Sequence, residues 1–175
     1  MLDVGASTGG FTEVCLARGA ARVWAVDVGR GQLHPRLAAD PRVTSLEGVD
    51  VRALDRSLIP EPPGLVVCDV SFIGLAKALP AALALAAPGA ALVLLVKPQF
   101  EVGPDRVGKG GVVKDPTARA AALAAVRTFL EGEGWCVQAS AESPVAGGDG
   151  NVEFLLWAQG PTSGDGLPSG RRTRP

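Results

Sequence analysis

Three side chains that could move a proton lie at or beside apolar segments. Asp69 follows the run Leu-Val-Val-Cys, Lys97 follows Leu-Val-Leu-Leu-Val, and Glu153 lies in the apolar stretch 152–158. A buried charge is costly unless it is paired, so we expect Asp69 to pair with Lys97. For Glu153 a solvated face of the sheet is the alternative to a functional role.

These residue types suit the removal of a proton from a hydroxyl group. A lysine accepts such a proton only when its pKa is lowered by burial or by neighbouring cations. A carboxylate can orient the lysine and offset its charge. Methyl transfer from S-adenosylmethionine (SAM) to a ribose hydroxyl needs little more, and Asp69, Lys97 and Glu153 are the candidate catalytic residues.

A glycine-rich turn opens the chain between a short apolar strand and a helical pattern. Such a turn lets a ligand approach the backbone and directs a helix N-terminus toward it. Its spacing is Gly-x-x-x-Gly-Gly, not the Gly-x-Gly-x-x-Gly of dinucleotide-binding turns. Asp3, just before the turn, suits a ligand with an ammonium group, which SAM carries. The alternative is a tight turn without a ligand; the other candidate binding residues are Gly5, Ser7, Gly9 and Gly10.

An acidic residue ends the second predicted strand, at 22–27. Asp27 comes about 20 residues after Gly5, where a carboxylate can bind both hydroxyls of a ribose. A turn or helix cap is the alternative for this residue. Asp50, which follows the predicted strand at 43–46, could meet the adenine of a nucleoside or be an exposed loop residue. Together these residues predict SAM as the cofactor.

Strand and helix patterns alternate along most of the chain. Such alternation predicts an α/β fold with a doubly wound, Rossmann-like sheet. The candidate SAM-binding residues make it a sheet of the SAM-dependent methyltransferase type. We expect this sheet to be mostly parallel with a terminal antiparallel pair, at 135–141 and 152–158. Ligands of such sheets bind outside the carboxyl ends of the strands, where the candidate residues cluster. The domain should cover 1–159, and the Gly-, Ser- and Arg-rich stretch 160–175 reads as a disordered tail.

Composition excludes several classes of protein. The 175 residues carry a formal net charge of −1, so no overall basic field attracts nucleic acid. The cysteines (Cys15, Cys68 and Cys136) are too few and too far apart for a disulfide framework or a zinc site, and we expect no metal. His34 is the only histidine, which excludes a histidine-based triad.

The most hydrophobic stretch, 74–96, is nominally long enough to span a bilayer. It contains Lys77, Pro80 and the pair Pro88-Gly89, which divide it into a helix, a turn and a buried strand. We therefore expect no membrane span and a cytoplasmic protein.

Several runs of the sequence resemble the TlyA family. Its members are bacterial proteins labelled as hemolysins and are similar to the FtsJ-like rRNA 2′-O-methyltransferases. The run Lys-Pro-Gln-Phe-Glu is specific to this resemblance, whereas the glycine turn alone is not. The matching stretches lie at 2–11, 25–33, 40–43, 69–73, 96–103, 107–113 and 150–154.

The resemblance implies a Lys-Asp-Lys-Glu catalytic tetrad, whose last three members match Asp69, Lys97 and Glu153. It also implies that SAM binds at Gly5, Ser7, Gly9, Asp27 and Asp50, and that rRNA or ribosomal subunits are the partners. In the family the first lysine of the tetrad and a small RNA-binding domain precede the first strand. We expect both to be absent from these 175 residues.

Other functions stay open at this point. A protein that lacks the first lysine could bind SAM or RNA without turnover. Asp69-Val-Ser-Phe72 loosely resembles the acidic loop of base N-methyltransferases, although Lys97 and Glu153 would then lack a role. The family label suggests a hemolysin-like pore, which no amphipathic segment supports. Lys109 and Lys114 could touch RNA phosphates or be solvated loop residues.

Overall fold

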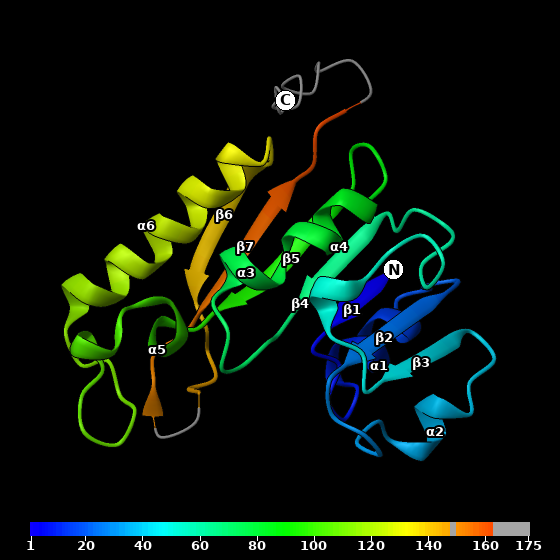
Figure 1. The fold of residues 1–175 in the computed structure, drawn as a ribbon, viewed down its shortest axis with the longest axis horizontal. Helices are drawn as coiled ribbons and strands as arrows, with labels where there is room; N and C mark the ends of the chain where they lie inside the picture. Colours follow the sequence, from blue (N-terminus) through cyan, green and yellow to red (C-terminus); the bar gives the residue numbers. More distant parts are fainter. Residues whose placement is uncertain (148–149, 163–175) are drawn as a thin grey trace, which may run out of the picture.

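Seven strands form one sheet in the order β3-β2-β1-β4-β5-β7-β6 (Figure 1). The computed structural model describes residues 1–147 and 150–162. Strands β1 to β5 are parallel, whereas β7 runs antiparallel to both β5 and β6. The strands are β1 (Leu2–Val4), β2 (Val23–Asp27), β3 (Val43–Glu47), β4 (Leu65–Cys68), β5 (Ala91–Val96), β6 (Cys136–Glu142) and β7 (Phe154–Gln159).

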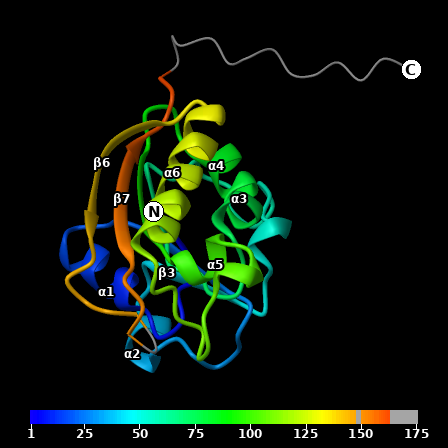
Figure 2. The ribbon, with the colours of Figure 1, turned by 90° about the vertical axis from the view of Figure 1, so that its left-hand side faces the viewer.

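Helices connect the parallel strands and cover both faces of the sheet. Figure 2 shows α3, α4 and α6 on one side of the sheet and α1 on the other. Asp115 starts the longest helix by accepting a hydrogen bond from the Thr117 N–H, followed by Pro116 in the first turn. The helical segments are α1 (Gly10–Ala17), α2 (Pro35–Ala38), η1 (Val51–Ala53), α3 (Leu75–Ala78), α4 (Pro80–Leu85), α5 (Pro98–Glu101), η2 (Pro104–Arg106) and α6 (Pro116–Gly132).

The side chains of strand β2 alternate between two apolar clusters, one on each face of the sheet. Trp24 and Val26 belong to the larger core, which includes Leu79 of the α3–α4 side and Leu130 of α6. The alternate residues Val23 and Ala25 belong to a second cluster with residues of α1 and α2. Successive strand side chains point to opposite faces, so a strand that is apolar throughout requires cover on both sides.

The predicted architecture is confirmed, with local differences. The single helix expected over 75–87 is two, α3 and α4, because Pro80 has no N–H to continue the first. Strand β7 begins at Phe154, so Glu153 comes immediately before the strand and not within it. Most of the predicted tail, 163–175, lies outside the described residues. Among the residues described, no helix is long and apolar enough to cross a membrane.

Candidate functional site

Two adjoining cavities lie at the carboxyl ends of β1, β2, β4 and β5. The larger has a volume of about 1230 Å³ and the smaller about 350 Å³. Gly5, Asp27 and Asp69 line the larger cavity, and Lys97 and Glu153 line the smaller. The two share part of their walls, from the loop after β4 and from α5 and its continuation: Ser71, Phe72, Gln99, Phe100 and Val107.

Asp27 joins the glycine turn to the end of β2. One carboxylate oxygen accepts a hydrogen bond from the Ser7 N–H and the other from the Gly29 N–H, both at 2.8 Å. Ser7 adopts a left-handed backbone with φ of 46°, which turns its N–H toward Asp27. A carboxylate oxygen has two lone pairs, so each retains one acceptor site for a ligand hydroxyl.

The glycines of the turn are required first by protein packing. At Gly5, where φ is +79°, a Cβ would lie 2.3 Å from the Asp69 carbonyl oxygen. At Gly9, where φ is +100°, it would lie 2.3 Å from Leu37 Cδ1. Gly5 and Ser7 line the larger cavity, whereas Gly9 and Gly10 are not among its lining residues. Cofactor contact by Gly9 and Gly10 stays a prediction.

Asp3 is fully buried in the middle of β1. Thr12 of α1 donates its hydroxyl to one oxygen of Asp3 at 2.6 Å. The other oxygen, Oδ1, is buried and has no hydrogen-bond partner within the described part of the chain. Burial raises the pKa of Asp3 from its ordinary 3.8 to about 6, although the Thr12 hydrogen bonds lower it. Asp3 lines neither cavity directly.

Asp50 lines the larger cavity at the start of η1. Its carboxylate accepts a hydrogen bond from the Arg52 N–H at 2.9 Å and forms an ion pair with the Arg52 guanidinium. These hydrogen bonds lower the pKa of Asp50 to about 2. The structure therefore gives Asp50 a capping role, and an adenine contact stays a prediction.

Lys97 and Asp69 form an ion pair between the two cavities. The Lys97 Nζ lies 2.6 Å from Asp69 Oδ1 and donates a hydrogen bond to the Ser71 hydroxyl at 3.1 Å. The Lys97 side chain is 14% exposed, so its head group is largely withdrawn from water. The expected pairing of Asp69 with Lys97 is therefore present. Ser71, a second group that orients the amine, was not identified from the sequence.

Glu153 is 5% exposed, which excludes the solvated-face alternative. Its Oε1 accepts a hydrogen bond from Gln99 Nε2 at 3.0 Å. A Cβ at Gly147, in the loop between β6 and β7, would lie 2.1 Å from this oxygen, so any other residue there would require the carboxylate to shift. Gln99 Oε1 is itself buried without a hydrogen-bond partner in the described residues.

The run Lys-Pro-Gln-Phe-Glu over 97–101 has a structural use for each residue. Lys97 pairs with Asp69, and Pro98 opens α5. Gln99 binds Glu153, and the Phe100 ring packs 5.2 Å from that of Phe72. Glu101 accepts a hydrogen bond from the Leu75 N–H and so caps α3. Five consecutive residues can make these different contacts because the single turn of α5 lies against both cavities and α3.

Phe72 has a conformation that packing does not explain. Its side chain is 91% exposed, its φ is +67°, and it lines both cavities. A left-handed backbone at a bulky residue is uncommon and often marks a functional position. The sequence pointed to the run Asp69-Val-Ser-Phe72 but not to this exposure. No cluster of metal-ligating side chains occurs among the described residues.

Comparison with known proteins gives consistent results. A family model of FtsJ-like methyltransferases matches residues 1–160. The chain is 53% identical over 156 residues to the 16S/23S rRNA (cytidine-2′-O)-methyltransferase TlyA of Mycobacterium tuberculosis, covering 89% of this chain and 58% of that protein. It is also similar to the structure of a hemolysin-labelled protein from Streptococcus thermophilus, with 40% identity and a TM-score of 0.87, over 92% of this chain and 60% of that one.

A more distant structure shares only the fold. It is the N-methyltransferase NodS from Bradyrhizobium japonicum in complex with S-adenosyl-L-homocysteine, at 19% identity and a TM-score of 0.63, covering 91% of this chain and 76% of that one. The chain spans less than two thirds of the length of the TlyA relative.

Proposed function

The chain belongs to the FtsJ-like methyltransferase family, and from this premise we propose that it is the catalytic region of a SAM-dependent RNA methyltransferase acting on a ribose 2′-hydroxyl of rRNA. The observation that carries the proposal is the Lys97–Asp69 ion pair at the boundary of the two cavities, with Glu153 in the same smaller cavity. A side chain that could accept a proton would thus lie between the cavity proposed for SAM and the cavity proposed for the RNA nucleotide.

The larger cavity suits SAM. Asp27 offers two oxygens, already fixed by backbone N–H groups, to the hydroxyls of a ribose. Asp3 has one unpartnered, buried oxygen but lines neither cavity, so its contact with a ligand ammonium stays a prediction. The volume of about 1230 Å³ is ample for a nucleoside with an amino-acid arm. When bound, SAM supplies an electrophilic methyl carbon on a positively charged sulfur.

The residues of the smaller cavity would handle the acceptor and its proton. The Lys97 ammonium of the ion pair would first lose a proton to solvent. The neutral amine would then accept the proton of the 2′-hydroxyl as the hydroxyl oxygen bonds the methyl carbon, and the methyl–sulfur bond of SAM would break to leave S-adenosylhomocysteine. The proton then remains on Lys97 as an ammonium that Asp69 stabilises. Ser71 fixes the direction of Nζ through the hydrogen bond at 3.1 Å. Such a positioned base typically contributes about 10²–10⁴-fold to the rate.

Phe72 and Phe100 supply the other contact that an RNA acceptor needs. Enzymes that modify a nucleotide commonly hold it outside its base stack, between aromatic or apolar side chains. The Phe72 ring is exposed at the mouth of both cavities and is supported by Phe100. It would stack on the base while the ribose enters the smaller cavity. Transfer to a base nitrogen would leave Lys97 and Glu153 without a role.

The proposal is tested by methyl transfer from tritiated SAM to ribosomal subunits. Lys97→Met removes the base, so turnover should fall by about 10²–10⁴-fold. SAM binding by calorimetry should be little changed, because Lys97 lines only the smaller cavity. The matched control is Arg18→Gln, which removes an exposed cation that lines neither cavity.

Methylation of the ribose makes the modified position resistant to alkaline cleavage. An interrupted alkaline ladder therefore supports the proposal, and a complete ladder on labelled RNA indicates base methylation. Wild-type levels of turnover in Lys97→Met would refute the role of Lys97. SAM binding without transfer to any ribosomal subunit would identify a binding protein without turnover.

A further inference from the structure

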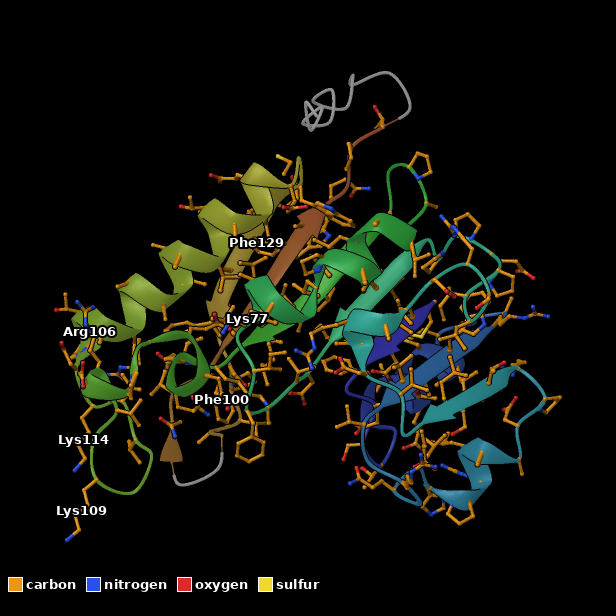
Figure 3. All side chains as sticks on the ribbon, viewed as in Figure 1. Lys77, Phe100, Arg106, Lys109, Lys114 and Phe129 are labelled. Atoms are coloured by element: carbon orange, nitrogen blue, oxygen red, sulfur yellow. The ribbon has the colours of Figure 1, made fainter. Side chains whose placement is uncertain are left out.

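The loop between α5 and α6 carries a cluster of basic residues that the proposed mechanism does not use. Arg106, Lys109 and Lys114 are all exposed, and Figure 3 shows them along one edge of the molecule, directed away from the ribbon. Among the other cations of the described residues, Arg22, Arg36 and Arg42 lie in ion pairs, whereas Arg18 and Arg119 do not. Within the described part of the chain, none of the three loop cations has a carboxylate partner.

The tip of this loop is a tight turn of fixed shape. Gly108 donates its N–H to the Val112 carbonyl at 3.0 Å, and Gly111 donates to the Gly108 carbonyl at 3.1 Å. Gly110 and Gly111 have φ of +82° and +78°, a conformation that favours glycine. Lys109 is the one residue of 108–111 with a side chain, so the turn presents a single ammonium at its tip.

Asn151 anchors the turn to the body of the protein. Its side chain is buried, accepts a hydrogen bond from the Val113 N–H at 3.0 Å, and donates one to the Gly111 carbonyl at 3.0 Å. Asn151 is two residues before Glu153, and both line the smaller cavity. These hydrogen bonds hold the backbone of the turn at Gly111 and Val113. The place of Lys109 along the backbone is therefore tied to the position of the candidate catalytic groups.

The turn also borders the space for the acceptor. Val107 and Gly111 line the smaller cavity together with Lys97. A nucleotide whose ribose occupies that cavity must carry its flanking phosphates past the rim. The segment also contains two carboxylates, Asp105 and Asp115, but that of Asp115 is occupied in capping α6.

From this arrangement we propose that the turn 108–112, with Lys109 at its tip and Arg106 and Lys114 beside it, binds the phosphate backbone of the RNA next to the methylated nucleotide. The inference rests on the proposed function, because it takes the smaller cavity as the acceptor site. It assigns a backbone contact that positions the strand but does not read its sequence. A chain of net charge −1 would thus bind RNA through a local basic edge, without a general basic field.

The test is the salt dependence of RNA binding, measured by fluorescence anisotropy. The probe is a fluorescein-labelled single-stranded oligoribonucleotide of mixed sequence, titrated between about 50 mM and 200 mM salt. Loss of one phosphate contact should lower the slope of log K against log [salt] by about 0.7. We expect this loss in Lys109→Gln, with a several-fold weaker affinity at low salt. Lys109→Arg should retain both, and Arg18→Gln serves as a matched loss of one exposed cation outside the site.

Binding of SAM by calorimetry separates this inference from the proposed function. Lys109→Gln should bind SAM as the wild type does, because Lys109 lines neither cavity. If wild-type protein binds and methylates RNA while Lys109→Gln has the same salt slope, the phosphate contact is wrong and the proposed function stands. If the wild-type chain binds SAM but no RNA at any salt concentration, both proposals are overturned. An equal loss of slope in Arg18→Gln would also overturn the assignment, since the effect would then be general.

Discussion

Replacing Asp3 by asparagine should make the stability of the protein less dependent on pH. Asp3 is fully buried, with a pKa of about 6 in the folded chain against an ordinary value of 3.8. The difference corresponds to about 3 kcal/mol of free energy, all of it unfavourable to the ionised folded state. Asparagine has no charge to bury and can still accept the hydrogen bond from Thr12.

The pH window follows from the two pKa values. Below pH 3.8 Asp3 is protonated in both states and contributes no pH-dependent term. Between pH 3.8 and about 6 the unfolded chain loses the proton and the folded chain keeps it, so the free energy of unfolding falls as pH rises. Above about pH 6 the loss is complete. The advantage of Asp3→Asn over wild type should therefore grow by about 2.5 kcal/mol from pH 4 to pH 8.

The change with pH is a sharper test than the stability at one pH. The asparagine Nδ2 would occupy the site of the unpartnered Oδ1, and a buried unpaired donor costs about 1–3 kcal/mol at every pH. Urea unfolding without SAM, followed by tryptophan fluorescence from pH 4 to 8, measures the difference. Asp105→Asn, an exposed carboxyl, is the control and should parallel the wild type. Parallel profiles for Asp3→Asn and wild type would refute the assignment of a buried, high-pKa carboxyl.

Two further variants test the cavities separately. Asp27→Ala removes the carboxylate that accepts from Ser7 and Gly29, and calorimetry should show SAM affinity reduced by at least about tenfold; unchanged affinity would mean that the ribose does not bind there. Gly147→Ala places a Cβ 2.1 Å from Glu153 Oε1 and should displace that carboxylate, so that methyl transfer falls while SAM affinity is retained. Wild-type turnover in this variant would argue against a role for Glu153.

The two cavities are linked by a small set of contacts. Asp69 lines the larger cavity and Lys97 the smaller, and the pair is held at 2.6 Å. Phe72 and Gln99 face both spaces. A ligand in one cavity therefore contacts side chains that also define the other, which suits a reaction between two bound molecules.

Local sequence signals determined the order of elements, and most of the candidate residues that they named line one of the two cavities. Apolar runs such as 65–68 and 91–96 indicated buried strands, and polar residues at their ends indicated a site, because parallel strands bring their carboxyl ends to one edge. The resemblance at 97–101 and 150–154 indicated Lys97 and Glu153 as functional residues. In the structure both residues line the smaller cavity, at this edge of the sheet.

Contacts between distant segments were decided only by the tertiary structure. The sequence cannot show that Gly5 lies against the Asp69 carbonyl, or that Gly147 lies against Glu153, because each pair meets only after the sheet assembles. The same holds for the hydrogen bond from Gln99 to Glu153 across 54 positions of the chain. Side-chain identity at one position predicts chemistry, whereas the partner that fixes its direction depends on packing. For this reason candidate residues could be named from the sequence, but the separation into two cavities could not.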